Sequence, residues 1–243
     1  SLSASNSLEN GYVKLYSRKG LKGGFFKFPK VTVTGTSNLI MASIFAKGVQ
    51  ILENISIEPE VIDLINFLNN SGADIQFKGK RTIRIRGIKK LNYGSHEIIG
   101  DRIEAFSYLC VAAITKGQIL LKNINPKHLL TELKVLKKIG CYIKVSENSI
   151  FLKSMKKHKP IKIETGPFPK YATDNMPMAL ALLTKTPGTS FISEKIFSNR
   201  FMAVPELNRI GAKITIENNN ATVVGQKNLY GADCISSDLR TTF

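Results

Sequence analysis

Gly117-Gln-Ile-Leu-Leu-Lys-Asn-Ile124 is the middle copy of a stretch that occurs three times. The other copies are Gly48-Val-Gln-Ile-Leu-Glu-Asn-Ile55 and Gly188-Thr-Ser-Phe-Ile-Ser-Glu-Lys-Ile196. Each glycine follows an apolar run with helical spacing and opens an apolar strand. A second series has nearly the same spacing: Gly72-Ala-Asp-Ile, Gly140-Cys-Tyr-Ile and Gly211-Ala-Lys-Ile. Two landmark series with one spacing indicate an internal repeat of about 70 residues.

The middle copy predicts the element order β-α-β-α-β-β. Its elements are expected at 96–99, 101–116, 118–124, 128–139, 141–145 and 149–153. The first helix is apolar nearly all round, which predicts burial on most sides. The second has one stripe, formed by Leu129, Leu130, Leu133, Leu136 and Ile139.

The outer copies repeat the same alternation of helices. In the first copy, the buried helix is expected to carry Leu39, Ile40, Met41, Ile44 and Phe45, and in the third it runs over Met176–Leu183. Buried helices that alternate with amphipathic helices and half-buried strands suggest helices inside and sheets outside. The predicted fold is therefore an inside-out α/β barrel of β-α-β-α-β-β repeats.

Composition narrows the function classes. The chain has 243 residues, 43% of them hydrophobic, and contains no apolar run long enough to span a membrane. Residues 1–8 lack the basic segment of a signal peptide. Cys110, Cys141 and Cys234 are expected to be buried, reduced thiols of a cytoplasmic protein. His96, His128 and His158 lack neighbouring ligands at metal spacing, so no metal site is expected.

The net charge of +17 comes from 27 Lys and only 8 Arg. Surfaces that read bases or clamp phosphates usually depend on Arg, so a generally basic surface is favoured over a nucleic-acid site. Lys80–Arg86 alternates basic and apolar residues, which indicates the outer face of a strand rather than a binding patch.

Each copy begins its buried helix with a capping residue. The expected caps are Thr36 or Ser37, Asp101, Thr173-Asp174 and Ser237-Asp238. Helix N-termini gathered on one face would attract anions. Arg102 and Arg240 follow their caps closely, and Lys30 and Arg200 lie near equivalent edges, which favours a phosphorylated or carboxylated ligand. The alternative is that the acidic residues only cap helices and the basic residues are surface charges.

Several motifs together resemble the UDP-N-acetylglucosamine 1-carboxyvinyltransferase family of bacterial enolpyruvyl transferases. The resemblance runs in order from about Glu9 to Arg240, nearly the whole chain. The motifs are Phe28-Pro-Lys-Val-Thr-Val-Thr-Gly35, Glu58-Pro-Glu-Val-Ile-Asp63, Gly100-Asp-Arg-Ile-Glu104, Thr173-Asp-Asn-Met176, Phe197-Ser-Asn-Arg-Phe-Met202 and Ser237-Asp-Leu-Arg240.

The resemblance implies a reaction of peptidoglycan synthesis. The enolpyruvyl group of phosphoenolpyruvate passes to the 3-hydroxyl of UDP-N-acetylglucosamine, and phosphate is released without a metal or organic cofactor. Asp174 would act as the general base, and Arg200 and Arg240 would bind phosphoenolpyruvate. Further substrate contacts would come from Lys30, Thr32, Val33, Thr34, Arg102, Ile196 and Asp238.

The family has two domains of three repeats each. The resemblance assigns residues 1–97 to the last repeat of the first domain. Residues 98–243 would be two repeats and the start of a third from the second. Several family features have no counterpart here, including an opening Lys-Asn pair, a loop with a reactive Cys or Asp, and a last C-terminal Arg. We therefore expect about half of an enzyme, which alone would be inactive and marginally folded.

Two other functions remain open at this stage. One is a transferase similar to 5-enolpyruvylshikimate-3-phosphate synthase, which shares the repeat and would act on a shikimate-like acceptor. The other is a non-catalytic module that binds phosphate-rich ligands or RNA. Saturable binding of a uridine-diphosphate sugar would favour the first assignment, and RNA affinity that falls steeply with salt would favour the module.

Overall fold

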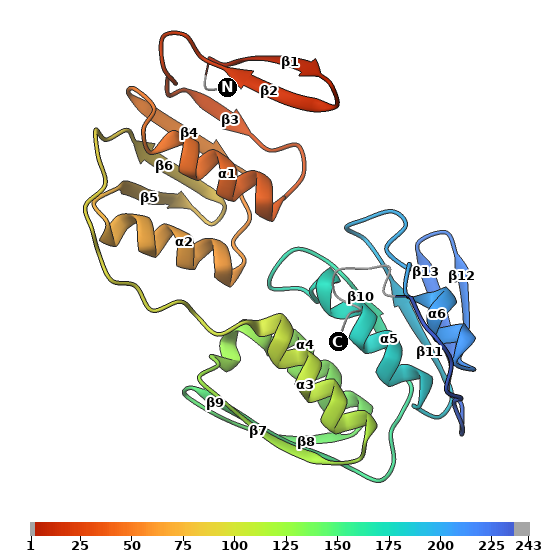
Figure 1. The fold of residues 1–243 in the computed structure, drawn as a ribbon. Helices are drawn as coiled ribbons and strands as arrows, with labels where there is room; N and C mark the ends of the chain where they lie inside the picture. The colour runs from red at the N-terminus through yellow and green to blue at the C-terminus, as the bar shows by residue number, and fades with distance from the viewer. Residues whose placement is uncertain (1–2, 236–243) are drawn as a thin grey trace. The chain divides into compact units, whose positions relative to one another are not determined.

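The computed structural model describes residues 3–235, which form two compact units (Figure 1). Unit 1 ends at Ile98 and unit 2 begins at Ile99. The sequence placed this boundary between residues 97 and 98. The assignment of each unit to a domain of the transferases stays a prediction. Each unit is described by itself below.

Unit 1 holds a hairpin and one complete repeat. The hairpin consists of β1 (Ser5–Glu9) and β2 (Tyr12–Tyr16), and it is exposed on both faces. The repeat consists of β3 (Phe25–Lys27), α1 (Val33–Ser43), β4 (Val49–Glu53), α2 (Pro59–Asn70), β5 (Asp74–Gly79) and β6 (Thr82–Arg86). Its sheet has the order β3-β4-β6-β5, with β3 and β4 parallel and the other pairs antiparallel.

The basic alternation of β6 lies as the sequence predicts. Ile83 and Ile85 are fully buried, whereas Arg84 and Arg86 lie on the opposite face and pair with Asp74 at 3.6 and 3.5 Å. Because successive side chains of a strand point to opposite faces, the basic residues form the outer face of this sheet.

Unit 2 holds two further repeats. The first consists of α3 (Arg102–Ile114), β7 (Gln118–Lys122), a 3₁₀ turn (Pro126–Leu129), α4 (Leu130–Ile139), β8 (Cys141–Ser146) and β9 (Ser149–Ser154). The second consists of β10 (Lys162–Glu164), a 3₁₀ turn (Thr173–Asn175), α5 (Met176–Thr184), β11 (Thr189–Ser193), α6 (Val204–Arg209), β12 (Lys213–Glu217) and β13 (Asn220–Val224). Their sheets have the orders β7-β9-β8 and β10-β11-β13-β12.

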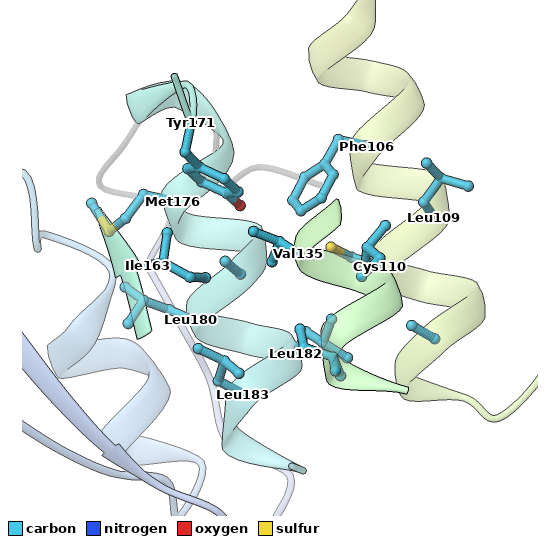
Figure 2. Close-up of a cluster of buried hydrophobic side chains, with 14 of the residues drawn as sticks. Phe106, Leu109, Cys110, Val135, Ile163, Tyr171, Met176, Leu180, Leu182 and Leu183 are labelled. Carbon is cyan, nitrogen blue, oxygen red and sulfur yellow. The ribbon is translucent and has the colours of Figure 1, made fainter. Parts of the chain in front are cut away.

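The inner helices of unit 2 pack against each other, with the sheets outside them (Figure 1). Phe106, Leu109 and Cys110 of α3 share one core with the apolar side chains of α5 and with Val135 of α4 (Figure 2). The predicted arrangement of inner helices and outer sheets is thus confirmed within unit 2.

The repeated glycines have a common structural reason. Gly72, Gly140 and Gly211 follow helix ends and have φ of 96°, 123° and 93°. Gly48 and Gly188 also lie in the left-handed region, where a side chain would be strained. In the middle repeat Lys116 takes that conformation, with φ of 58°, one residue before Gly117.

One predicted strand is absent. Residues 96–99 form no strand, so β7 lacks the parallel neighbour that β4 and β11 have. His96 instead contacts α2, with its Nε2 2.9 Å from Asp63 Oδ1 and its ring at the edge of the Phe67 ring. These contacts join the segment to α2 within unit 1.

Other predictions of burial were wrong at single positions. Met41 and Phe45 of α1 are exposed, because nothing in unit 1 packs on that side of the helix. Leu130 is exposed because α4 begins there, after a 3₁₀ turn that shifts it off the stripe. Cys234 is exposed beyond the last strand, whereas Cys110 and Cys141 are buried.

Candidate active site

Asp174 lies in the 3₁₀ turn that precedes α5. The helix begins at Met176, its N-cap position is Asn175, and no side chain caps it. The prediction that Asp174 caps this helix was therefore wrong, since the turn moves the helix start two residues along the chain. A carboxylate without a capping role here needs another explanation.

Asp174 forms an ion pair with Arg200. Arg200 Nη2 donates to Asp174 Oδ1 at 2.8 Å, although 26 residues separate them in sequence. The side chains are 40% (Asp174) and 19% (Arg200) exposed, so the carboxylate remains accessible to a ligand. The guanidinium of Arg200 also lies 5.9 Å from the centroid of the Phe197 ring. The structure thus joins two residues that the motifs singled out separately.

Arg102 is the second arginine of this region. It is the first residue of α3 and is buried, so it is not the surface charge of the alternative interpretation. Its guanidinium lies 5.8 Å from the centroid of Phe168, in the loop that leads to Asp174. The Phe168–Pro169 peptide bond in that loop is cis. Arg102 therefore contacts the loop of the following repeat.

Of the caps predicted for α3 and α1, the first is confirmed and the second is wrong. Asp101 caps α3, where its Oδ1 accepts hydrogen bonds from Ile103 N at 2.7 Å and Glu104 N at 3.2 Å. In unit 1 the cap is Thr32, which accepts from Gly35 N at 3.3 Å, and not Thr36 or Ser37. Thr36 lies inside α1, where its hydroxyl donates to Thr32 O and accepts from Ser56 N.

The remaining candidates lie in both units. Lys30, Thr32, Val33 and Thr34 are at the start of α1 in unit 1, with Lys30 and both threonines exposed. Ile196 of unit 2 is half-buried in the segment that leads to Arg200. Arg240 and Asp238 lie outside the described residues, as does the predicted cap at Ser237.

Two buried glutamates beside Asp174 were missed by sequence reasoning. Glu132 of α4 accepts hydrogen bonds from Ala172 N at 2.9 Å and Asn175 Nδ2 at 3.3 Å. Glu194, directly after β11, accepts from Thr173 Oγ1 at 2.8 Å and from the amides of Ile196 and Phe197. The repeated copies offered one signal, because Glu194 is a carboxylate in the buried stretch after Gly188.

Tyr171 completes the packing under the turn. It is fully buried, with its ring edge-on to Phe106 and its hydroxyl donating to Asn175 O at 3.1 Å. Burial raises its pKa well above the usual value, and the nearby Cys110 and Glu132 add to the shift. The tyrosine is therefore a neutral hydrogen-bond donor that supports the turn.

Two kinds of site find no support in the described part of the chain. Between residues 3 and 235, no three His, Cys, Asp or Glu side chains gather as a metal site would require. No helix there has the length and apolar character needed to cross a membrane.

Comparison with curated proteins gives close relatives over the whole chain. UDP-N-acetylglucosamine 1-carboxyvinyltransferase of Bartonella tribocorum is 46% identical, with 97% of this chain and 56% of that protein covered. Proteins of the same name from Pelagibacter ubique and Helicobacter pylori strain P12 are 45% and 41% identical, covering 96% and 99% of this chain and 56% and 58% of theirs. The chain therefore spans a little over half the length of these relatives, and the resemblance drawn from the motifs is confirmed.

Two solved structures share the fold. The enolpyruvyl transferase NikO from Streptomyces tendae matches with a TM-score of 0.80 at 20% identity, covering 92% of this chain and 56% of that one. An EPSP synthase from Acinetobacter baumannii matches with 0.68 at 17% identity, covering 94% and 55%. The predicted enolpyruvyl transferase fold is thus confirmed.

The family match covers nearly every residue. Residues 3–243 match the family described as EPSP synthase (3-phosphoshikimate 1-carboxyvinyltransferase). With this match, the fold and the relatives in agreement, the chain belongs to that family of enolpyruvyl transferases.

Proposed function

We propose that this chain is part of an enzyme that transfers the enolpyruvyl group of phosphoenolpyruvate to the 3-hydroxyl of UDP-N-acetylglucosamine. Relatives of that name, 40–46% identical across the chain, support the choice of acceptor. The solved transferases of other names are only 17–20% identical. A shikimate-like acceptor therefore has less support.

The observation that carries the mechanism is the pair of Asp174 and Arg200. Asp174 does not cap its helix, yet it is held 2.8 Å from a guanidinium at an accessible position. In the proposed addition step, Asp174 takes the proton of the sugar 3-hydroxyl. The hydroxyl oxygen then bonds to C2 of phosphoenolpyruvate, and C3 of phosphoenolpyruvate takes up a proton. In the elimination step, C3 loses a proton and the bond from C2 to the phosphate oxygen breaks.

Arg200 is proposed to bind phosphoenolpyruvate and to stabilise the charge of the tetrahedral adduct. A guanidinium matches phosphate and carboxylate oxygens with two parallel hydrogen bonds, which favours Arg over Lys in this role. Arg240 would share this role, and Arg102 and Asp238 would help to form the site. Lys30, Thr32, Val33, Thr34 and Ile196 are proposed to contact the uridine-diphosphate sugar.

The remaining parts of the proposal concern the whole protein. We propose a cytoplasmic protein with small-molecule substrates, in which this chain functions together with further sequence of the same polypeptide. No observation favours RNA as a partner. The intact mass of the purified protein measures how much sequence accompanies these residues.

Ligand binding tests the proposal directly. UDP-N-acetylglucosamine at millimolar concentration should raise the melting temperature of the complete protein, because a ligand that binds only the native state stabilises it. Phosphate should be released when phosphoenolpyruvate is added. If neither effect occurs in a full-length protein, while RNA binds and weakens steeply with salt, the binding-module hypothesis replaces this one.

Arg200→Ala separates the two substrates. It should weaken phosphoenolpyruvate binding and lower turnover together, while the affinity for UDP-N-acetylglucosamine stays within a few fold. Equal loss of both affinities would argue against a specific role of Arg200 toward phosphoenolpyruvate.

A further inference from the structure

Residues 172–175 form a short turn that donates hydrogen bonds to two buried carboxylates. Glu132 and Glu194 are only 2% and 1% exposed, and both accept hydrogen bonds from this turn. Carboxylates are rarely buried this deeply without a specific partner, so their common target needs an explanation.

Glu132 reaches the turn from the neighbouring repeat. It lies on α4, about 40 residues before the turn, and one oxygen, Oε1, accepts from both Ala172 N and Asn175 Nδ2. The preceding residue of α4, Thr131, donates its hydroxyl to Pro169 O at 2.6 Å. The first turn of α4 therefore makes three hydrogen bonds with the loop, two before Asp174 and one after it.

Glu194 joins the Asp174 turn to the segment that carries Arg200. Its Oε2 accepts from Thr173 Oγ1 at 2.8 Å, and its Oε1 accepts from Ile196 N at 2.7 Å and Phe197 N at 3.1 Å. One buried side chain thus sets the distance between the residue before Asp174 and the chain that leads to Arg200.

The hydrogen bonds of the two glutamates follow one pattern around Asp174. Ala172, Thr173 and Asn175 are each held by a buried glutamate, and Asp174 between them pairs with Arg200. We propose that Glu132 and Glu194 are positioning residues that fix the Asp174–Arg200 pair, with Glu132 acting across the boundary between two repeats. Packing of α4 against the next repeat thereby sets the geometry of the site.

The catalytic meaning of this inference rests on the proposed function, but its geometric content does not. The test therefore reads the ion pair itself. In isotope-labelled protein, a guanidinium held by a carboxylate gives resolved Nη–H signals in NMR spectra, which average when the group rotates freely. Asp174→Asn identifies the Arg200 signals that depend on the pair.

The structure distinguishes two substitutions of Glu132. Glu132→Gln keeps a carbonyl oxygen that can accept from both Ala172 N and Asn175 Nδ2, so the Arg200 signals should persist. Glu132→Leu removes the acceptor and leaves two buried donors without one, so the signals should be lost as in Asp174→Asn. Thr173→Val removes the link to Glu194 with little change in shape and should weaken the same signals.

Ser154→Ala is the matched control. Ser154 is also buried in unit 2 and also makes two hydrogen bonds, to Ala113 O and His158 Nε2, but it contacts neither segment of the site. It should leave the Arg200 signals unchanged. In a protein that turns over, Glu132→Leu should lower turnover by up to about 100-fold, because a misplacement near 1 Å costs that much.

Persistence of the Arg200 signals in both Glu132→Leu and Thr173→Val would overturn the inference and leave the proposed reaction untouched. If Glu132→Leu does not fold, Thr173→Val decides alone. Loss of the signals in Glu132→Gln as well as in Glu132→Leu would also count against it, because charge and not the acceptor would then matter.

Discussion

The inner helices of the two units differ in how far their apolar sides are buried. Met41 on α1 of unit 1 is 45% exposed, whereas Leu182 on α5 of unit 2 is 1% exposed in the core shared by α3, α4 and α5 (Figure 2). A second repeat covers Leu182, whereas unit 1 has a single repeat and leaves Met41 exposed.

This difference shows which contacts support the turn that carries Asp174. In unit 2 two repeats share one core, and the same contact between repeats places α4 beside the Asp174 turn. Unit 1 has a single repeat, whose core is closed by its own sheet and helices. The Asp174–Arg200 ion pair lies in the part of unit 2 where two repeats meet.

The largest expected effect contrasts Leu182 with Met41. Leu182→Ala should lower the free energy of unfolding of unit 2 by about 2–5 kcal/mol, since it empties part of a closed core. Met41→Ala should cost less than about 1 kcal/mol in unit 1, because the side chain is already half in water. Hydrogen exchange of amides in each unit measures both values. Equal costs would mean that Met41 is covered in solution.

Acid should act on unit 2 through His158. This side chain is buried, and burial lowers its pKa from 6.5 to about 4, with the charge of Lys116 adding to the shift. Between these pH values the unfolded chain binds a proton at His158 and the folded chain does not. The free energy of unfolding therefore falls as pH drops from about 6.5 to about 4. The loss amounts to roughly 3 kcal/mol.

His158→Gln serves as the control for this pH dependence. Denaturant titrations at pH 7 and pH 4.5 should show a smaller difference for the variant than for the wild type. A wild-type unit 2 that is equally stable at both pH values would contradict the buried, neutral state of His158.

The smallest expected effect concerns the two helix caps. Asp101→Ala removes two hydrogen bonds to the first turn of α3, and Thr32→Ala removes one longer bond at α1. Each should cost about 1 kcal/mol, with Asp101 the larger. Thermal melts of the single variants measure this order. A larger loss for Thr32→Ala would indicate that α1 depends on its cap more than on packing.

Much of the fold could be predicted because the repeat requires glycine at equivalent backbone positions. Gly72, Gly140 and Gly211 occupy left-handed positions that few other residues tolerate, so their spacing marks equivalent helix ends. The missing strand at 96–99 could not be foreseen, because His96 contacts Asp63, 33 residues earlier, and no local sequence pattern marks that contact.

The site was predicted less completely than the fold. The motifs identified Asp174 and Arg200, but their sequence separation gave no sign that they pair. Glu132 follows helical spacing that suggests a surface charge, and only the packing of the next repeat buries it. The cap expected at Thr173-Asp174 is wrong because a 3₁₀ turn before a helix has no clear sequence signature.

The role of Asp174 is the central claim, and its conservative substitution tests it most directly. Phosphate release should be measured for the complete enzyme with Asp174→Asn, together with the affinity for UDP-N-acetylglucosamine by calorimetry. We expect turnover to fall by about 100-fold or more, as for loss of a general base, with the affinity changed only a few fold. Wild-type turnover in Asp174→Asn would contradict the account and leave the Asp174–Arg200 pair a structural contact.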